Sequence, residues 1–129
     1  MIIKSIIKVK DDYMLTIDSE DIKVDENTIV KYNLYVNKEI SNSHLDNAYI
    51  ASKINISEVY LRKIFKKHLN TSPRQYLIKL RMERALNLLF KNISIKEISH
   101  DVGYDSIYSF SRAFKSIYKQ SPQQYIKNF

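Results

Sequence analysis

The sequence of 129 residues contains no cysteine, one glycine and two prolines. Without cysteine, disulfides, thiolate metal sites and cysteine nucleophiles are excluded. A single glycine excludes a glycine-rich phosphate-binding loop. So little glycine and proline leaves few residues for tight β-turns, which favours helices that begin at side-chain caps.

Long hydrophobic runs are also absent. No apolar stretch reaches the roughly 18 residues of a membrane-spanning helix. Lysines interrupt the first residues, Met-Ile-Ile-Lys-Ser-Ile-Ile-Lys, too often for the apolar region of a secretory signal. The sequence therefore predicts a soluble, cytoplasmic protein with no membrane partner.

Positive charge is concentrated in one part of the chain. Residues 1–43 carry 6 basic and 8 acidic side chains, whereas residues 44–129 carry 15 basic and 6 acidic ones. A compact basic domain fits a polyanion such as DNA, RNA or an acidic membrane surface. The alternative is a lysine-rich solvated surface, as expected from a genome biased toward Ile, Lys and Asn codons.

Several serines carry the signature of a helix N-terminus. Ser72 and Ser121 each precede a proline and lie three residues before a glutamine, and Ser94 lies three residues before Glu97. These are capping boxes, in two cases with proline at the first helical position. N-caps without the second half of the box are predicted at Asp46, Ser57 and Ser106.

The apolar pattern changes at about residue 28. From there on, apolar residues follow helical spacing, both before the first capped helix and along the segment after Pro73. Residues 1–27 alternate imperfectly between apolar and polar positions. This N-terminal extension is interpreted as either a short hairpin or a disordered arm.

Two stretches of the chain repeat one another. Residues 60–66 correspond to 109–115, and residues 72–76 to 121–125, at an offset of 49. Upstream, residues 50–55 correspond to 98–103 at an offset of 48, so the second copy has one extra residue in its turn. A length difference confined to a turn is what two copies of one supersecondary unit should show.

Each copy has the features of a helix-turn-helix. The turns centre on Asn55 and Gly103, the residue types that best tolerate a left-handed backbone. A basic helix follows each turn and begins at a capping serine, Ser57 or Ser106. The sequence thus predicts an all-α domain over residues 28–129. Its parts are a first helix-turn-helix over about 46–69, a linking helix over about 73–91, a second helix-turn-helix over about 94–118 and a closing helix over about 122–127.

Further residues form an ordered pattern along these elements. The first unit has Ile50-Ala51, Tyr60-Leu61 and Phe65-Lys66-Lys67. The linking helix has Ser72-Pro73, Tyr76, Arg81, Ala85 and Leu88-Leu89. The second unit has Ile98, Gly103-Tyr104, Phe110-Ser111-Arg112, Phe114-Lys115 and Ser121-Pro122. Over residues 45–129 this pattern resembles the DNA-binding domain of the AraC/XylS family of bacterial transcription regulators, which implies two helix-turn-helix units that bind DNA.

The chain departs from the family pattern at three turns. Glycine is frequent in the family where this chain has Asn55, Asn70 and Lys119. Asparagine adopts the left-handed conformation at modest cost, whereas a left-handed Lys119 costs roughly 1 kcal/mol. Many members also carry a large sensing or dimerising domain before this one, so the chain is either a short stand-alone regulator or a fragment of a longer one.

The resemblance assigns roles to the outward faces of the two basic helices. In the first unit it places base contacts at Val59, Arg62 and Lys63. In the second unit, helical spacing turns Ile107, Tyr108, Ser111 and Arg112 outward, and Arg112 is the main candidate for reading a base. Phosphate contacts are expected from capping hydroxyls and flanking lysines, namely Ser57, Lys66, Ser106, Ser109 and Lys115.

The resemblance implies a sequence-specific regulator of transcription that binds double-stranded DNA and acts as an activator. It would insert two recognition helices into successive segments of the major groove. RNA polymerase is a partner implied by the same resemblance. A single molecule is expected on DNA, with a dimer formed through the N-terminal arm as the alternative.

Other classes of function remain open at this stage. The chain could be an interaction module that binds a protein through residues 1–43, or a nucleic-acid binder without sequence preference. An enzyme is not expected, because no catalytic constellation is present. No metal or other cofactor is predicted either, since His44, His68 and His100 lack the spacing of metal ligands.

Overall fold

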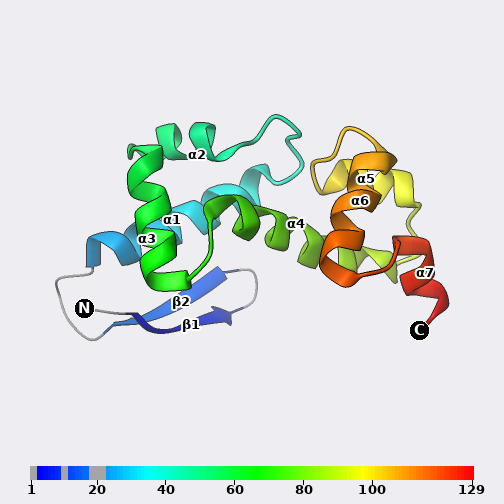
Figure 1. The fold of residues 1–129 in the computed structure, drawn as a ribbon, viewed down its shortest axis with the longest axis horizontal. Helices are drawn as coiled ribbons and strands as arrows, with labels where there is room; N and C mark the ends of the chain where they lie inside the picture. Colours follow the sequence, from blue (N-terminus) through cyan, green and yellow to red (C-terminus); the bar gives the residue numbers. More distant parts are fainter. Residues whose placement is uncertain (1–2, 10–11, 18–22) are drawn as a thin grey trace. The chain divides into compact units, whose positions relative to one another are not determined.

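A computed structural model describes the backbone of residues 3–9, 12–17 and 23–129, with side chains from Asp25 onward. Parts of the N-terminal extension predicted for residues 1–27 therefore lie outside the described residues. Within that segment, β1 (Ile3–Val9) and β2 (Asp12–Ile17) pair antiparallel. Their register runs from Val9 opposite Asp12 to Ile3 opposite Ile17, with an irregularity between Ile3 and Ser5 (Figure 1).

From Lys23 onward all the regular secondary structure is helical, which confirms the all-α class predicted for the domain. The helices are α1 (Lys23–Glu39), α2 (Asn47–Lys53), α3 (Glu58–Leu69), α4 (Pro73–Leu89), α5 (Ile95–Asp101), α6 (Ile107–Tyr118) and α7 (Pro122–Lys127). Two of their pairs, α2 with α3 and α5 with α6, are the helix-turn-helix units of the repeat (Figure 1).

The helices begin where the capping residues predicted them. Asp46, Ser57, Ser94 and Ser106 each accept a hydrogen bond from a backbone N–H three residues later. Ser121 forms the complete capping box, because the Gln124 side chain accepts in return from the Ser121 N–H. Such caps satisfy backbone donors that have no partner within the helix, which typically stabilises it by about 1 kcal/mol.

The backbone is left-handed at each of the turn residues discussed above. Asn55 has φ 60°, Asn70 φ 52° and Lys119 φ 66°, and Gly103 has φ 88°. Asn70 and Lys119 are the C-caps of α3 and α6. The second unit thus ends its basic helix with a lysine in a conformation that costs about 1 kcal/mol relative to glycine.

The chain divides into two compact units. The first consists of residues 1–39 and 46–74, and the second of residues 40–45 and 75–129. In the first unit, α1 contributes Ile29, Tyr32 and Val36 to a core shared with α2 and α3. The ring centres of Tyr32 and Phe65 lie 4.8 Å apart, and the Tyr32 hydroxyl donates to Asn47 Oδ1 at 2.7 Å.

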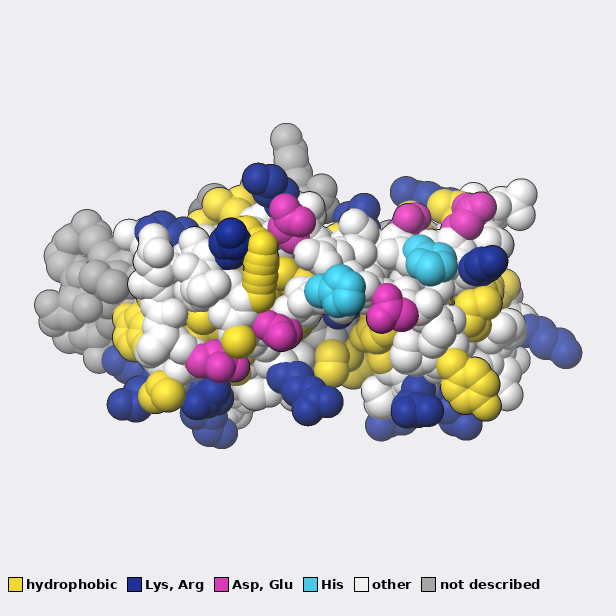
Figure 2. All heavy atoms as spheres, turned by 90° about the horizontal axis from the view of Figure 1, so that it is seen from above, with side chains coloured by type: hydrophobic (Ala, Val, Ile, Leu, Met, Phe, Trp, Pro, Cys, Tyr) yellow, Lys and Arg dark blue, Asp and Glu magenta, His cyan; other side chains and the backbone are white. Residues whose placement is uncertain are grey.

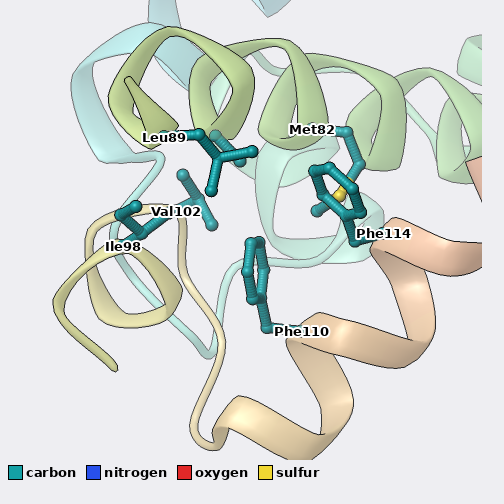
Figure 3. Packing of buried hydrophobic residues seen from close by; sticks show 7 residues of the cluster. Met82, Leu89, Ile98, Val102, Phe110 and Phe114 are labelled. Carbon is teal, nitrogen blue, oxygen red and sulfur yellow. The ribbon is translucent and has the colours of Figure 1, made fainter. Parts of the chain in front are cut away.

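The second unit has its own core between α4, α5 and α6. Seven buried residues form it, namely Met82, Ala85, Leu89, Ile98, Val102, Phe110 and Phe114. Figure 3 shows the labelled side chains from the three helices pointing toward one another. In the second unit, α4 therefore supplies the apolar surface that a short helix-turn-helix cannot provide by itself.

Arg81 on α4 has a structural role in the second unit. Its side chain is buried, and its Nη2 donates to the Asn42 carbonyl at 3.0 Å. The guanidinium also lies over the ring of Tyr104, 5.6 Å from its centre. Burial of a charged group is tolerated because these partners replace water.

Candidate nucleic-acid interface

Helix α3 has a buried face and a charged face. Leu61, Ile64 and Phe65 pack into the first unit's core, as helical spacing predicted. The opposite face is exposed and consists of Glu58, Val59, Arg62, Lys63 and Lys66. Val59, with 54% of its surface exposed, has no role in the core.

An ion pair occupies the middle of this exposed face. Arg62 Nη1 lies 3.9 Å from Glu58 Oε1, and the two side chains are 57% and 48% exposed. A pair four residues apart on an exposed helix surface contributes only about 0.3–0.5 kcal/mol. Arg62 can therefore leave Glu58 for a stronger acceptor at little cost.

A shallow hollow lies beside the N-terminal part of α3. Its lining comes from α2, α3 and the start of α4, namely Asn47, Glu58, Leu61, Arg62, Ser72, Pro73 and Arg74. Two arginines and a serine hydroxyl therefore surround one surface depression. These are donors for an anionic or hydrogen-bond-accepting partner.

Helix α6 has the same division of faces. Phe110 and Phe114 are buried, and Ala113 packs against the core they belong to. Outward lie Ile107 and Tyr108, 41% and 80% exposed, followed by a partly exposed Ser111 and an exposed Arg112. Ser106 caps the helix, and its hydroxyl lies 3.0 Å from that of Ser109.

A second hollow lies over this outward face. It is lined by Ile107, Tyr108, Ser111, Arg112, Lys115 and Ser121. At the repeat's offset of 49, Glu58, Arg62 and Ser72 of the first hollow correspond to Ile107, Ser111 and Ser121 of the second. The repeat thus includes the surface hollow as well as the helices, and each unit presents one.

Basic side chains line both hollows: Arg62 and Arg74 the first, and Arg112 and Lys115 the second. In the view of Figure 2, dark-blue Lys and Arg side chains project from the surface, with fewer magenta Asp and Glu side chains among them. The segment that holds both hollows, residues 44–129, has 15 basic and 6 acidic residues. Such a surface attracts polyanions through a potential that adds over many charges.

A family model described as a helix-turn-helix domain matches residues 50–128. This range contains α3, α6 and the seven-residue core of the second unit. The chain belongs to the AraC-type helix-turn-helix family.

Curated proteins similar to this AraC-type chain include operon regulators. The Msm operon regulatory protein of Streptococcus mutans is 43% identical over 79 residues, which are 60% of this chain and 28% of that protein. The lactose operon transcription activator of Staphylococcus xylosus is 36% identical over 87 residues, 67% of this chain and 31% of that protein. The chain thus spans less than a third of the length of these relatives.

Solved structures give the same family. The C-terminal domain of AraT, a response regulator from Geobacillus stearothermophilus, is 35% identical, with a TM-score of 0.74 over 86% of this chain and 89% of that one. A transcriptional regulator from Chromobacterium violaceum, described as having an AraC-type DNA-binding domain, is 26% identical. Its TM-score is 0.68 over 77% of this chain and 88% of that one.

The structure places the residues predicted for the AraC-type interface in two groups. Val59, Arg62, Lys63 and Lys66 share the exposed face of α3, and Ser57 caps that helix. On α6, Ile107, Tyr108, Ser111, Arg112 and Lys115 follow the cap formed by Ser106 and Ser109. The contacts of these residues with DNA stay predictions.

Three residues that line the hollows and can donate hydrogen bonds are not predicted as site residues from the sequence. Ser72 and Arg74 line the first hollow, and Ser121 lines the second. The sequence pattern marks Ser72 and Ser121 only as helix caps, although they are equivalent positions of the repeat. Their place beside the exposed helix faces follows from packing of the next helix, which no local pattern encodes.

Among the residues whose side chains are described, no three His, Asp or Glu residues gather where they could hold a metal ion. None of the described helices is long and apolar enough to cross a membrane.

One polar cluster joins α1 to α3. Asp25 accepts a hydrogen bond from the Tyr60 hydroxyl, and its Oδ2 lies 2.9 Å from Nε2 of His68, whose side chain is fully buried. Burial raises the pKa of the Asp25 carboxyl, but hydrogen bonds from Tyr60 and His68 and the charge of Lys67 lower it to a net value below 3.8. The hydrogen bond to Asp25, followed by burial, raises the pKa of Tyr60 to about 12.

We expect this cluster to make stability depend on pH at both extremes. A raised tyrosine pKa stabilises the fold below the ordinary value of 10, and that contribution is lost as pH rises through about 12. The lowered pKa of Asp25 contributes above 3.8 and is lost as pH falls through its folded value. Tyr60→Phe should therefore flatten the loss of stability between pH 10 and 12, as measured by urea unfolding across pH.

Tyr108→Phe is the matched control, because it removes an exposed hydroxyl from the other unit. It should leave the difference between pH 10 and pH 12 as in the wild type. Equal alkaline profiles for wild type and Tyr60→Phe would contradict the role given to the hydrogen bond between Tyr60 and Asp25.

Proposed function

We propose that the chain is a sequence-specific regulator of transcription that binds double-stranded DNA through α3 and α6. The observation that carries this proposal is the repeated surface: each unit presents the exposed face of one capped helix, with an arginine next to a hollow. Membership of the AraC-type family and relatives named as operon regulators support it. The two helices would enter successive segments of the major groove.

The outward side chains supply the contacts that such reading needs. Arg62 and Arg112 can each donate two hydrogen bonds to O6 and N7 of a guanine, worth about 1–3 kcal/mol of discrimination. Lys63 adds a further donor at the same face of α3. Val59, Ile107 and Tyr108 offer apolar contact, and Ser111 can donate or accept.

Phosphate contacts would fix the position of each helix on the duplex. Ser57 and Ser106 accept backbone hydrogen bonds as caps, which leaves a hydroxyl hydrogen that can donate to a phosphate oxygen. Ser109 lies beside the second cap, and Lys66 and Lys115 flank the two faces. Ser72, Arg74 and Ser121 add donors at the rims of the hollows.

We further propose that the chain activates transcription through contact with RNA polymerase and that one molecule occupies one site. The name of the lactose operon transcription activator supports the first point. The second is supported by the two differing helix faces within one chain, because a single molecule then suffices to read an asymmetric site.

Selection of binding sites from a random pool of duplexes tests the proposal. We expect an asymmetric motif with two separated blocks. Arg62→Ala should relax one block and Arg112→Ala the other, each with about a 10- to 100-fold loss of affinity for the selected site. Arg84→Ala, which removes an exposed arginine of α4 outside both hollows, is the matched control and should keep both blocks.

Two outcomes of this selection would contradict the proposal. If no motif emerges and affinity follows salt concentration alone, the chain is a binder of nucleic acid without sequence preference. If both arginine variants relax the same block, the assignment of one helix to each block is wrong.

A further inference from the structure

The two exposed helix faces differ in chemistry at equivalent positions. In α3, the first position and the one four residues later hold Glu58 and Arg62, which form an ion pair. In α6, the same positions hold Ile107 and Ser111. The next pair of equivalent positions holds Val59 in α3 and Tyr108 in α6. The first face is therefore largely charged, and the second begins with two large apolar side chains.

Packing does not explain the apolar start of α6. Phe110 and Phe114 fill the core from the opposite face of the helix, while Ile107 and Tyr108 remain 41% and 80% exposed. Single exposed apolar residues are common on protein surfaces. These two, however, lie side by side in sequence and line one hollow together with Arg112 and Lys115. The lining of this hollow therefore combines two apolar side chains with two cationic ones.

The charge of this hollow indicates what covers it. Two cations in its lining, on a segment with 15 basic and 6 acidic residues, favour a polyanion over an apolar peptide or a second copy of the chain. Within the major groove of DNA, the apolar group that bases present is the C5-methyl group of thymine. A lining with both apolar and cationic side chains is complementary to thymine methyls and the phosphates near them.

We infer that α6 reads a thymine-containing segment of the major groove through C5-methyl groups. Ile107 and Tyr108 are then specificity-determining residues of the second unit, in addition to Arg112. The face of α3 reads its block mainly through Arg62 and has one apolar residue, Val59. This inference rests on the proposed function and adds the chemical class of the sequence that each helix selects. The two blocks of the site differ in base composition because the two helix faces differ.

The expected effect is modest in size and specific in its location. Removing one buried methyl group from the contact weakens binding about fourfold. If two methyls meet Ile107 and Tyr108, affinity falls about 15-fold when both are removed. The effect should be found in the block that Arg112→Ala relaxes.

Uracil substitution tests the inference without changing the protein. Deoxyuridine replaces thymidine in the α6 block alone or in the α3 block alone of the selected duplex. It keeps the pairing and the O4 acceptor and removes only the methyl group. Dissociation constants are measured for wild type, Ile107→Ala and Tyr108→Ala, with Ile126→Ala as the control at an exposed isoleucine of α7.

Wild type and Ile126→Ala should bind the uracil duplex at least about fourfold more weakly when the substitution is in the α6 block. Ile107→Ala should bind the thymine and uracil duplexes with nearly equal affinity at the position it contacts. Uracil in the α3 block should give an effect that does not depend on Ile107.

Two results would overturn the inference, and they are distinguishable. A two-block motif with equal wild-type affinity for thymine and uracil in the α6 block refutes methyl reading and leaves the proposed function intact. A selection that yields no motif refutes both. The comparison of wild-type affinity for the thymine and uracil duplexes needs no variant. The test therefore stays decisive even if Ile107→Ala does not fold.

Discussion

Gly103→Ala is expected to destabilise the second unit by about 2–5 kcal/mol. Gly103 has φ 88°, and a side chain in a left-handed region costs roughly 1–2 kcal/mol. An added Cβ would also lie 2.4 Å from the carbonyl oxygen of Ile40 and 2.8 Å from Nη2 of Arg81. Contacts this short force their neighbours to move, and overpacking of this kind costs about 1–3 kcal/mol more.

The neighbours of Gly103 have little room to move. Nη2 of Arg81 donates to the Asn42 carbonyl at 3.0 Å, and its guanidinium lies over the Tyr104 ring. The other close atom is a backbone oxygen, which moves only with the segment 40–45. Relief of the clash would therefore disturb the buried guanidinium of Arg81. The predicted loss is large, because the total free energy of unfolding of a small protein is only about 5–15 kcal/mol.

Chemical denaturation and amide exchange measure this effect, and exchange also locates it. The amides of α5 and α6 should exchange faster in Gly103→Ala. Asn55→Ala, at the equivalent turn of the first unit, should cost only about 1 kcal/mol. Gly103→Asn separates the two causes, because asparagine tolerates the left-handed backbone but carries the same Cβ. Wild-type stability of Gly103→Asn would show that the close approach is unimportant.

The parts of the fold that the sequence predicts correctly depend mostly on local signals, namely helix caps, left-handed turns and helical periodicity. Caps such as Ser57 and Ser106 and the left-handed turns at Asn55 and Gly103 depend on residues within one helical turn. The inward faces of α3 and α6 follow from a period of 3.6 residues. The repeat then linked these elements in order, because two copies of one pattern are improbable by chance.

Contacts between distant residues were not predictable in this way. Asp25 meets His68 across 43 positions, and Arg81 meets Asn42 across 39. No periodic or capping signal marks such pairs, because tertiary packing alone brings them together. The same reason explains why Arg74 was not predicted beside α3. Helical spacing gave the exposed faces, but the hollows depend on the element that follows each helix.

Phe114→Ala is expected to cost about 3–5 kcal/mol, as for other buried phenylalanines. The Phe114 side chain has no solvent exposure, and its ring centre lies 4.7 Å from that of Tyr118 and 5.6 Å from that of Tyr125. It also meets the ring of Phe110 at 5.9 Å. Truncation removes these ring pairs, each worth about 0.5–1.5 kcal/mol beyond burial, and leaves a cavity under α6.

Phe129→Ala is the matched control for this change. Its ring centre is 5.2 Å from that of Phe90, but the side chain is 84% exposed, so its loss should cost less than about 1 kcal/mol. Thermal or urea unfolding compares the two variants. A cost below about 1 kcal/mol for Phe114→Ala would contradict its place at the centre of the aromatic core.

The same variant separates folding from reading of DNA. Phe114 lies on the buried face of α6 and leaves Ile107, Tyr108 and Arg112 on the outward face unchanged in identity. Phe114→Ala should weaken the α6 block of the selected motif only by the fraction of the second unit that it unfolds, and binding should recover on cooling toward the temperature of maximum stability. Arg112→Ala should weaken the same block at unchanged stability. Loss of binding by Phe114→Ala under conditions where the second unit is still folded would instead mean that the core sets the geometry of α6 on the DNA.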